Sequence, residues 1–188
     1  MKTKTIYFDH LGILSNNERA TNIFLILLGS FFIAILAQIS IPLPFSPVPI
    51  TGQTVGVILV GGILGSKRGA LSILCYILEG ASGLPVFAQM NAGIHVLVGP
   101  TAGYIWGFVI AAFLVGYLSE KGMALKPMFC FLTCLFSTIL ILVIGTAYLT
   151  IFKINLNEAL IMGFYPFLVG GLIKSFLCTL ILVNLRKF

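Results

Sequence analysis

Six apolar stretches, separated by short polar or Pro/Gly-rich segments, dominate this sequence. They run from Asn22 to Ile41, Thr54 to Gly65, Gly69 to Ala81, Thr101 to Ser119, Pro127 to Thr150 and Ala159 to Leu185. Only 9% of the 188 residues are charged and 59% are hydrophobic, whereas soluble domains carry about a quarter charged residues. The sequence therefore predicts an all-α integral membrane protein, a compact bundle of six transmembrane helices.

The second and third stretches are short for membrane spans. A transmembrane helix needs roughly 20 apolar residues, so these two cross only if their helices extend into the flanks or the bilayer thins locally. No soluble domain is left over, and no cleaved signal sequence is recognisable. We expect a single domain covering residues 1–188, with 1–21 as a cytoplasmic N-terminal segment and 22–185 as the membrane bundle.

Basic residues predict the orientation. When the segments between spans are assigned to alternate sides of the membrane, nine basic residues fall on one side and Lys153 alone falls on the other. Lys174 lies inside a span. The nine are Lys2, Lys4, Arg19, Lys67, Arg68, Lys121, Lys126, Arg186 and Lys187. By the positive-inside rule, both termini are cytoplasmic in a multi-pass protein of the cell membrane. The net charge of +6 is explained by this topology, and no nucleic-acid partner is predicted.

Two of the outward loops differ from ordinary connections. The segment Leu43–Gln53 contains three prolines, and Ser82–Pro100 is long, apolar and punctuated by Gly and Pro. Proline removes a backbone donor and disfavours helix in the preceding residue. We expect non-helical loops that cap a substrate at the outer face; loops that only dip into the headgroup region are the alternative.

Lys174 is the most informative single residue, because a lysine at the centre of a membrane helix costs about 2.5–3.5 kcal/mol. Phe167, Gly170 and Gly171 fall within about 60° of it on a helix, which makes a notch beside a cation. This notch suits a small carboxylate ligand. The alternative is a lysine that snorkels to the interface, or one that pairs with Glu79 or a backbone carbonyl.

Other polar side chains of the outward segments are candidates for the same site. Gln53, Gln89, Asn91 and His95 include amides that donate and accept hydrogen bonds, as a ureido or amide ligand requires. Glu79 and Tyr104 are two further candidates for this site. The alternative for Glu79 is a carboxylate that reaches water, and the alternative for Tyr104 is an aromatic membrane belt shared with Trp106.

The motifs of catalysis and metal binding are absent from the sequence. The string Gly61–Arg68 places its lysine out of register for a phosphate loop, so the chain does not hydrolyse ATP on its own. Two histidines and four cysteines within apolar stretches give no triad or metal spacing. We predict no enzyme activity, no metal and no cofactor.

Three loop strings resemble the BioY family of biotin uptake proteins. They are Val48–Thr54 (VPITGQT), Gly80–Phe87 (GASGLPVF) and Gly99–Tyr104 (GPTAGY), with the basic turn Gly65–Gly69 (GSKRG) between the first two. The resemblance implies the substrate-binding S component of an energy-coupling factor (ECF) transporter. Such a protein captures biotin at its outer face and delivers it inward with a transmembrane coupling subunit and two ATPase subunits.

The resemblance also implies roles for individual residues. In the last span Pro166, Phe167, Gly170 and Lys174 match the family pattern, but Gly171 stands where an aspartate is expected. Glu79 or Asn91 are the candidates to replace that carboxylate. Small residues of the first span contact the coupling subunit in this family, and their nearest equivalents are Ser30, Ala34 and Ala37.

Two other classes of function stay open. One is an S component for another small vitamin with a carboxylate. The other is a small membrane enzyme or channel, but an enzyme should show titratable groups clustered across several spans and a channel polar residues along a pore. The sequence offers one intramembrane lysine.

Overall fold

The structure is a computed structural model of the chain, and it describes residues 18–152 and 154–185. Within this part the chain is mostly helical, as predicted. Most of the predicted N-terminal segment 1–21 lies outside the described residues. The same holds for five of the basic residues used to predict topology, namely Lys2, Lys4, Lys153, Arg186 and Lys187.

Helices of 12 residues or more form in all six predicted apolar stretches. They are α1 (Glu18–Gln38), α2 (Gln53–Leu64), α3 (Ser66–Ala81), α5 (Ala102–Glu120), α6 (Pro127–Leu149) and α8 (Tyr165–Leu185). Among the described residues, four segments are long and apolar enough to cross a membrane: α1, α5, α6 with the turn after it, and α8 with the helix before it. Since α2 and α3 have 12 and 16 residues, the number of crossings stays a prediction.

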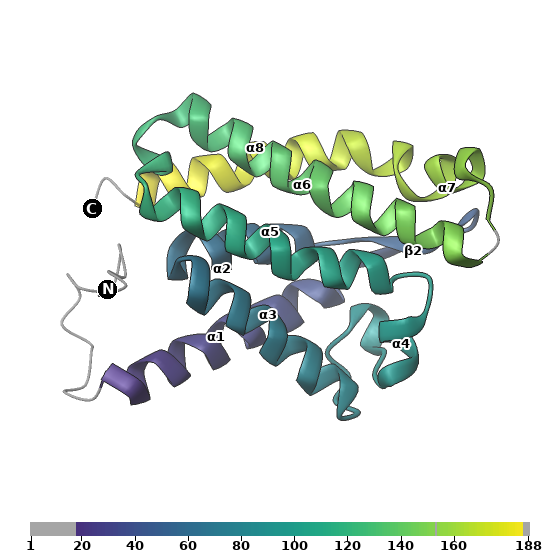
Figure 1. Cartoon of the computed structure of the whole chain (residues 1–188), viewed down its shortest axis with the longest axis horizontal. Helices are drawn as coiled ribbons and strands as arrows, with labels where there is room; N and C mark the ends of the chain where they lie inside the picture. The colour runs from purple at the N-terminus through teal and green to yellow at the C-terminus, as the bar shows by residue number, and fades with distance from the viewer. Residues whose placement is uncertain (1–17, 153, 186–188) are drawn as a thin grey trace.

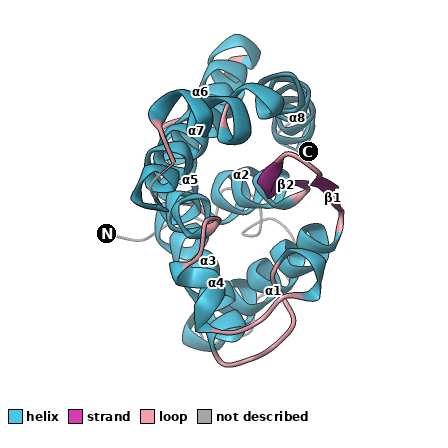
Figure 2. Ribbon diagram, turned by 90° about the vertical axis from the view of Figure 1, so that its right-hand side faces the viewer, coloured by secondary structure: helices cyan, strands magenta, loops and turns pink. Residues whose placement is uncertain are grey.

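Helix α2 lies in the middle of the other long helices (Figure 2) and contacts each of them. Nine of its 12 residues are buried, as expected for a helix that is apolar on all sides. At Gly61 an added Cβ would lie 2.5 Å from the Ala112 carbonyl oxygen of α5, and one at Gly69 of α3 would lie 2.8 Å from the Gly61 Cα. Glycine therefore lets three helix backbones meet closely.

The small residues of α1 face the interior of this chain, although Ser30, Ala34 and Ala37 are the residues predicted to contact a coupling subunit. Each is at most 8% exposed, and α1 packs against α3 and α2. The Ser30 hydroxyl donates a hydrogen bond to the Glu79 carboxylate of α3. A stripe of small residues brings helices close whether the neighbour belongs to the same chain or to another, so its spacing did not distinguish the two.

The fold is not purely helical, because residues 40–51 form an antiparallel hairpin. Strand β1 (Ser40–Leu43) pairs with β2 (Ser46–Thr51), and Ile41 lies opposite Ile50. The non-helical character predicted for Leu43–Gln53 is confirmed up to Gly52, but the strand pairing corrects the all-α prediction. Prolines are tolerated here because each strand of a two-stranded ribbon has a free edge. The other loop predicted to be non-helical, Ser82–Pro100, contains two short helices, Ala88–Met90 and Ile94–Val98.

The last apolar stretch is broken near its start. Helix α7 (Leu156–Gly163) begins with a capping box between Asn155 and Glu158, and α8 begins two residues after α7 ends. Pro166 lies in the first turn of α8, where the missing N–H costs nothing. The Ser46 hydroxyl donates to the Met162 carbonyl at 2.7 Å, so α7 and the hairpin are tied together.

The hairpin, α7 and the short helix α4 (Ile94–Val98) lie at one end of the bundle (Figure 1). The first described residue of α1 and the last of α8 lie at the opposite end, together with the α2–α3 and α5–α6 turns. The sequence predicts the same grouping, in which the basic turns share one side with the chain ends and the outward loops lie on the other side. Which end faces the cytoplasm stays a prediction.

Candidate ligand-binding site

A pocket opens at the end of the bundle that carries the hairpin and the segment 82–101. About 870 Å³ of space lies between the protein atoms there, the open mouth included. Its described lining comes from β2, the start of α2, the segment 82–101, α5, α6 and α8. Segments distant in sequence therefore converge on one cavity.

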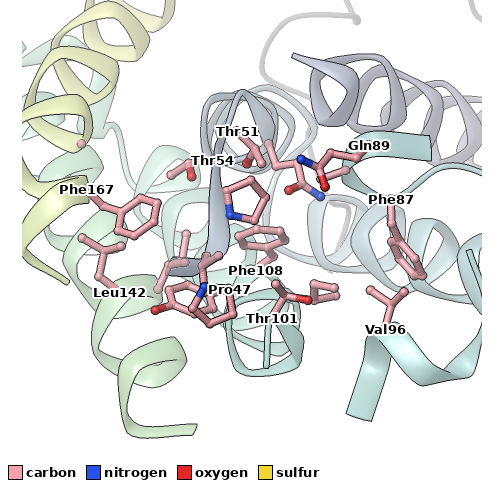
Figure 3. Close-up of a pocket in the computed structure, with 18 of the residues that line it drawn as sticks. Pro47, Thr51, Thr54, Phe87, Gln89, Val96, Thr101, Phe108, Leu142 and Phe167 are labelled. Atoms are coloured by element: carbon pink, nitrogen blue, oxygen red, sulfur yellow. The ribbon is translucent and has the colours of Figure 1, made fainter. Parts of the chain in front are cut away.

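Apolar side chains make up opposite walls of the pocket (Figure 3). Phe167 of α8 and Leu142 of α6 lie on one side, and Phe87 and Val96 lie on the other. Phe108 of α5 lies between the two walls. The cavity is thus suited to a ligand with apolar faces.

Lys174 is the one cation among the described residues that line the pocket. Its ammonium donates to the Thr51 carbonyl at the end of β2, with an Nζ to oxygen distance of 2.7 Å. Of the two partners considered from the sequence, the structure therefore shows a backbone carbonyl and not Glu79. An ammonium has three N–H donors, so this bond leaves two for a ligand.

The notch predicted beside Lys174 is present in part. Phe167 and Gly171 line the pocket, whereas Gly170 does not. On a helical projection Gly170 falls on the other side of Lys174 from Gly171, and a Cβ at Gly170 would meet nothing within 4 Å. Gly171 is buried, and a Cβ there would lie 3.0 Å from the Thr138 methyl carbon.

Gln53 brings an amide to the pocket from the first turn of α2. The side chain is 5% exposed, and its Nε2 donates to the Tyr76 hydroxyl of α3 at 2.6 Å. Tyr76 is fully buried and is not part of the lining. The amide is therefore oriented by a residue behind the wall.

Gln89 and Asn91 line the pocket from the segment 82–101, while His95 does not. The Asn91 Nδ2 donates to the Ala88 carbonyl at 2.9 Å. Gln89 and its neighbour Met90 have φ angles of 60° and 58°, the left-handed region that costs non-glycine residues about 1–3 kcal/mol each. The surrounding contacts must hold this turn in place.

Tyr104 is a wall residue and not part of an exposed aromatic belt. It is 6% exposed, and its hydroxyl donates to the Gly163 carbonyl of α7 at 2.9 Å. Its ring lies 6.4 Å from that of Phe167 between centroids. Trp106 is 44% exposed, so the belt interpretation applies to Trp106 alone.

Glu79 does not line the pocket, although it was among the predicted binding residues. Its carboxylate faces α1, where it accepts from the Ser30 hydroxyl, and it also accepts from the Cys75 thiol with an Sγ to Oε1 distance of 3.4 Å. Glu79 therefore joins α1 and α3 and is not part of the pocket lining.

Several wall residues were missed by the sequence interpretation. Thr138 of α6 is an example, since it is a hydroxyl inside an apolar run; it contacts the Ser175 hydroxyl at 3.1 Å and donates to the Cys134 carbonyl. Helix α6 also carries Thr133, Ser137 and Thr146, so its sequence gives no signal that singles out Thr138. The other lining residues without a sequence prediction of their own include Pro47, Thr51, Thr54, Phe108, Ile141 and Leu142.

The described lining contains no carboxylate, thiol or imidazole group. Across residues 18–152 and 154–185, no three His, Cys, Asp or Glu side chains are placed to hold a metal ion. What the pocket offers is an ammonium, amides, hydroxyls and aromatic walls. These groups are complementary to an anionic ligand with a polar, hydrogen-bonding end.

Comparison with known sequences gives matches along nearly the whole chain. The model of the BioY family matches residues 5–188. A protein of Thermotoga maritima named biotin transporter BioY is 38% identical over 165 residues, covering 87% of this chain and 95% of that protein. A probable biotin transporter BioY of Pyrococcus horikoshii is 38% identical over 168 residues, covering 89% and 98%.

The fold is also similar to that of a solved structure. The match is a crystal structure of the S-component for biotin from an ECF-type ABC transporter, with a TM-score of 0.81 and 30% sequence identity. It covers 93% of this chain and 95% of the other.

Proposed function

Because this chain belongs to the BioY family, we propose that it is the biotin-binding S component of an ECF transporter. The observation that carries this proposal is the composition of the pocket, in which Lys174 and the amides of Gln53, Gln89 and Asn91 line one cavity between aromatic walls. Biotin has a carboxylate at one end and a ureido ring at the other, and the two are joined by apolar atoms. Each part of biotin has a complementary group in this lining.

The lining residues have distinct roles in this proposal. The Lys174 ammonium binds the carboxylate, with a bond retained to the Thr51 carbonyl. The amides of Gln89 and Asn91 bind the ureido group, which donates and accepts hydrogen bonds as amides do. Phe167 and Tyr104 pack on the apolar part of the ligand, and Gly171 leaves room beside it.

Equilibrium binding of labelled biotin to the purified protein tests this function. We expect saturable binding that unlabelled biotin displaces fully. Nicotinate, a carboxylate vitamin without a ureido ring, should displace it poorly. Absence of saturable binding to folded protein, or tighter binding of another carboxylate vitamin, would contradict the assignment to biotin.

We also propose that the chain crosses the cell membrane six times, with both termini in the cytoplasm and the pocket open to the outside. The turns with Lys67 and Lys121 lie at the same end as the described chain ends (Figure 1), which supports this orientation by the positive-inside rule. Helix α2, about 18 Å long at 1.5 Å per residue, is enclosed by its neighbours and needs no full-length contact with lipid.

Single cysteines should report this orientation in intact cells. Leu84→Cys, in the segment 82–101 and at a site 51% exposed, should react with a membrane-impermeant maleimide. Lys67→Cys should react only after the cells are opened. Lys67 is preferred to its neighbour Ser66, which is buried and hydrogen-bonded to Glu120. Labelling of Lys67→Cys from outside would contradict the topology.

Transport in this proposal needs partners, namely a transmembrane coupling subunit and two ATPase subunits that hydrolyse ATP. The absence of a phosphate loop in the sequence supports this division of labour. The chain itself binds and releases biotin without chemical change, so we propose no enzyme activity and no cofactor.

A further inference from the structure

Gln38, the last residue of α1, is bonded to the segment 82–101 from both sides of one turn. Its Nε2 donates to the Val86 carbonyl at 3.3 Å and the Phe87 carbonyl at 3.2 Å, and its Oε1 accepts from the Met90 N–H at 3.1 Å. The same Nε2 lies 3.1 Å from the Ala34 carbonyl of its own helix. Gln38 is not among the residues that line the pocket.

The turn that Gln38 brackets is conformationally unfavourable by itself. Gln89 and Met90 are both left-handed without being glycine, and Met90 is 66% exposed, so burial of its side chain does not compensate. The turn carries Phe87, Gln89 and Asn91 into the pocket wall. Relaxation of the two left-handed residues would therefore displace wall residues.

The other side of the segment rests on α3. The Phe87 ring packs edge-to-face on Tyr76 with centroids 5.4 Å apart, and it fills the space where a Cβ of Gly80 would lie. The Gly93 N–H donates to the Gly80 carbonyl at 2.7 Å. The segment is thus seated on α3, and Gln38 contributes the contacts from α1.

We infer that Gln38 is a positioning residue, which holds the turn 86–91 in the conformation that places Phe87, Gln89 and Asn91 in the pocket wall. Its two-sided hydrogen bonding offsets the unfavourable backbone of Gln89 and Met90 without a contact to the ligand. The choice of biotin as probe rests on the proposed function. The expected effect on the turn does not rest on that function, because the turn has this conformation without a ligand.

Replacement of Gln38 with leucine keeps a side chain of similar size and removes both the hydrogen-bond donor and the acceptor. Apparent affinity falls with the fraction of molecules in the binding-competent conformation, so Gln38→Leu should weaken biotin binding by about tenfold, mostly through faster dissociation. Glycine adopts positive φ without steric cost. Met90→Gly should therefore change the wild-type affinity less than about twofold and recover most of the loss in the Gln38→Leu background.

Hydrogen–deuterium exchange of the ligand-free protein gives a second readout. Amides of residues 87–93 should exchange about tenfold faster in Gln38→Leu than in the wild type, since exchange reports local opening. Amides of α6 should be unchanged, and Ile39→Ala, at a neighbouring site 62% exposed, is the control that should leave residues 87–93 protected.

The outcomes separate this inference from the proposed function. Unchanged exchange at residues 87–93 in Gln38→Leu would overturn the positioning role, whatever the ligand is. Equal effects of Met90→Gly in both backgrounds would also overturn it, because relief of a shared strain is not additive. If the wild type fails to bind biotin while Gln38→Leu still speeds exchange at residues 87–93, the function is wrong and the positioning role stands.

Discussion

Replacing Lys174 with methionine should weaken the binding of biotin by about tenfold or more. A hydrogen bond to a charged group contributes about 1.5–3 kcal/mol, and each 1.4 kcal/mol is a factor of ten in affinity. Among the described residues of the lining, Lys174 is the only cation, so the carboxylate loses its charged partner. Methionine keeps an unbranched side chain that is shorter by one atom, the ammonium nitrogen. Isothermal titration with the purified variants measures the effect.

Biotin amide separates the two roles that the structure gives Lys174. Its ammonium already donates to the Thr51 carbonyl of the hairpin, so the substitution also removes a tie between α8 and β2. Loss of that tie alone would weaken biotin and biotin amide equally. Loss of a carboxylate contact weakens biotin more, so the affinities of the two ligands should converge in Lys174→Met. Equal affinity of the wild type and Lys174→Met for biotin would place the carboxylate elsewhere.

The helices were predictable because each one forms within a continuous apolar stretch, and the hairpin was not. Pro47 and Pro49 alternate with Val48 and Ile50, which is the strand period. Proline alone indicates the absence of helix, whereas this alternation also indicates a strand. Similarly, Pro166 lies within the apolar stretch Ala159–Leu185, which predicts one continuous span. Its preference for the first turn of a helix marks the start of α8, and the break before it creates α7.

The site was predictable where a residue was unusual for its surroundings. Lys174 stands out within an apolar span, and Gln89 and Asn91 stand out in an apolar loop. Thr138 and Phe108 resemble the rest of their helices, so only the packing of α5 and α6 places them at the pocket. Glu79 was equally unusual, but its partner is Ser30 of α1. An unusual polar residue therefore predicts a partner and does not say whether that partner is a ligand.

Ala34→Trp should abolish binding by preventing the bundle from folding. Ala34 is 8% exposed, and it lies on the face of α1 that packs within the bundle. Extra methylenes in a packed core typically destabilise a protein by about 1–3 kcal/mol, occasionally more. An indole adds far more volume than a few methylenes do. Had Ala34 been part of an exposed docking surface, the same substitution would have left binding intact and stopped uptake alone.

The matched control is Ile35→Trp, one residue along the same helix. Ile35 is 50% exposed, so an indole there has room in the lipid or at a partner surface. We expect Ile35→Trp to elute as a monodisperse protein with wild-type biotin affinity, and Ala34→Trp to give little folded protein at equal expression. Fluorescence-detected size exclusion measures both. A folded Ala34→Trp protein that binds biotin normally would mean that α1 stands away from α2 and α3 in the membrane, and the interior placement of its small residues would then be wrong.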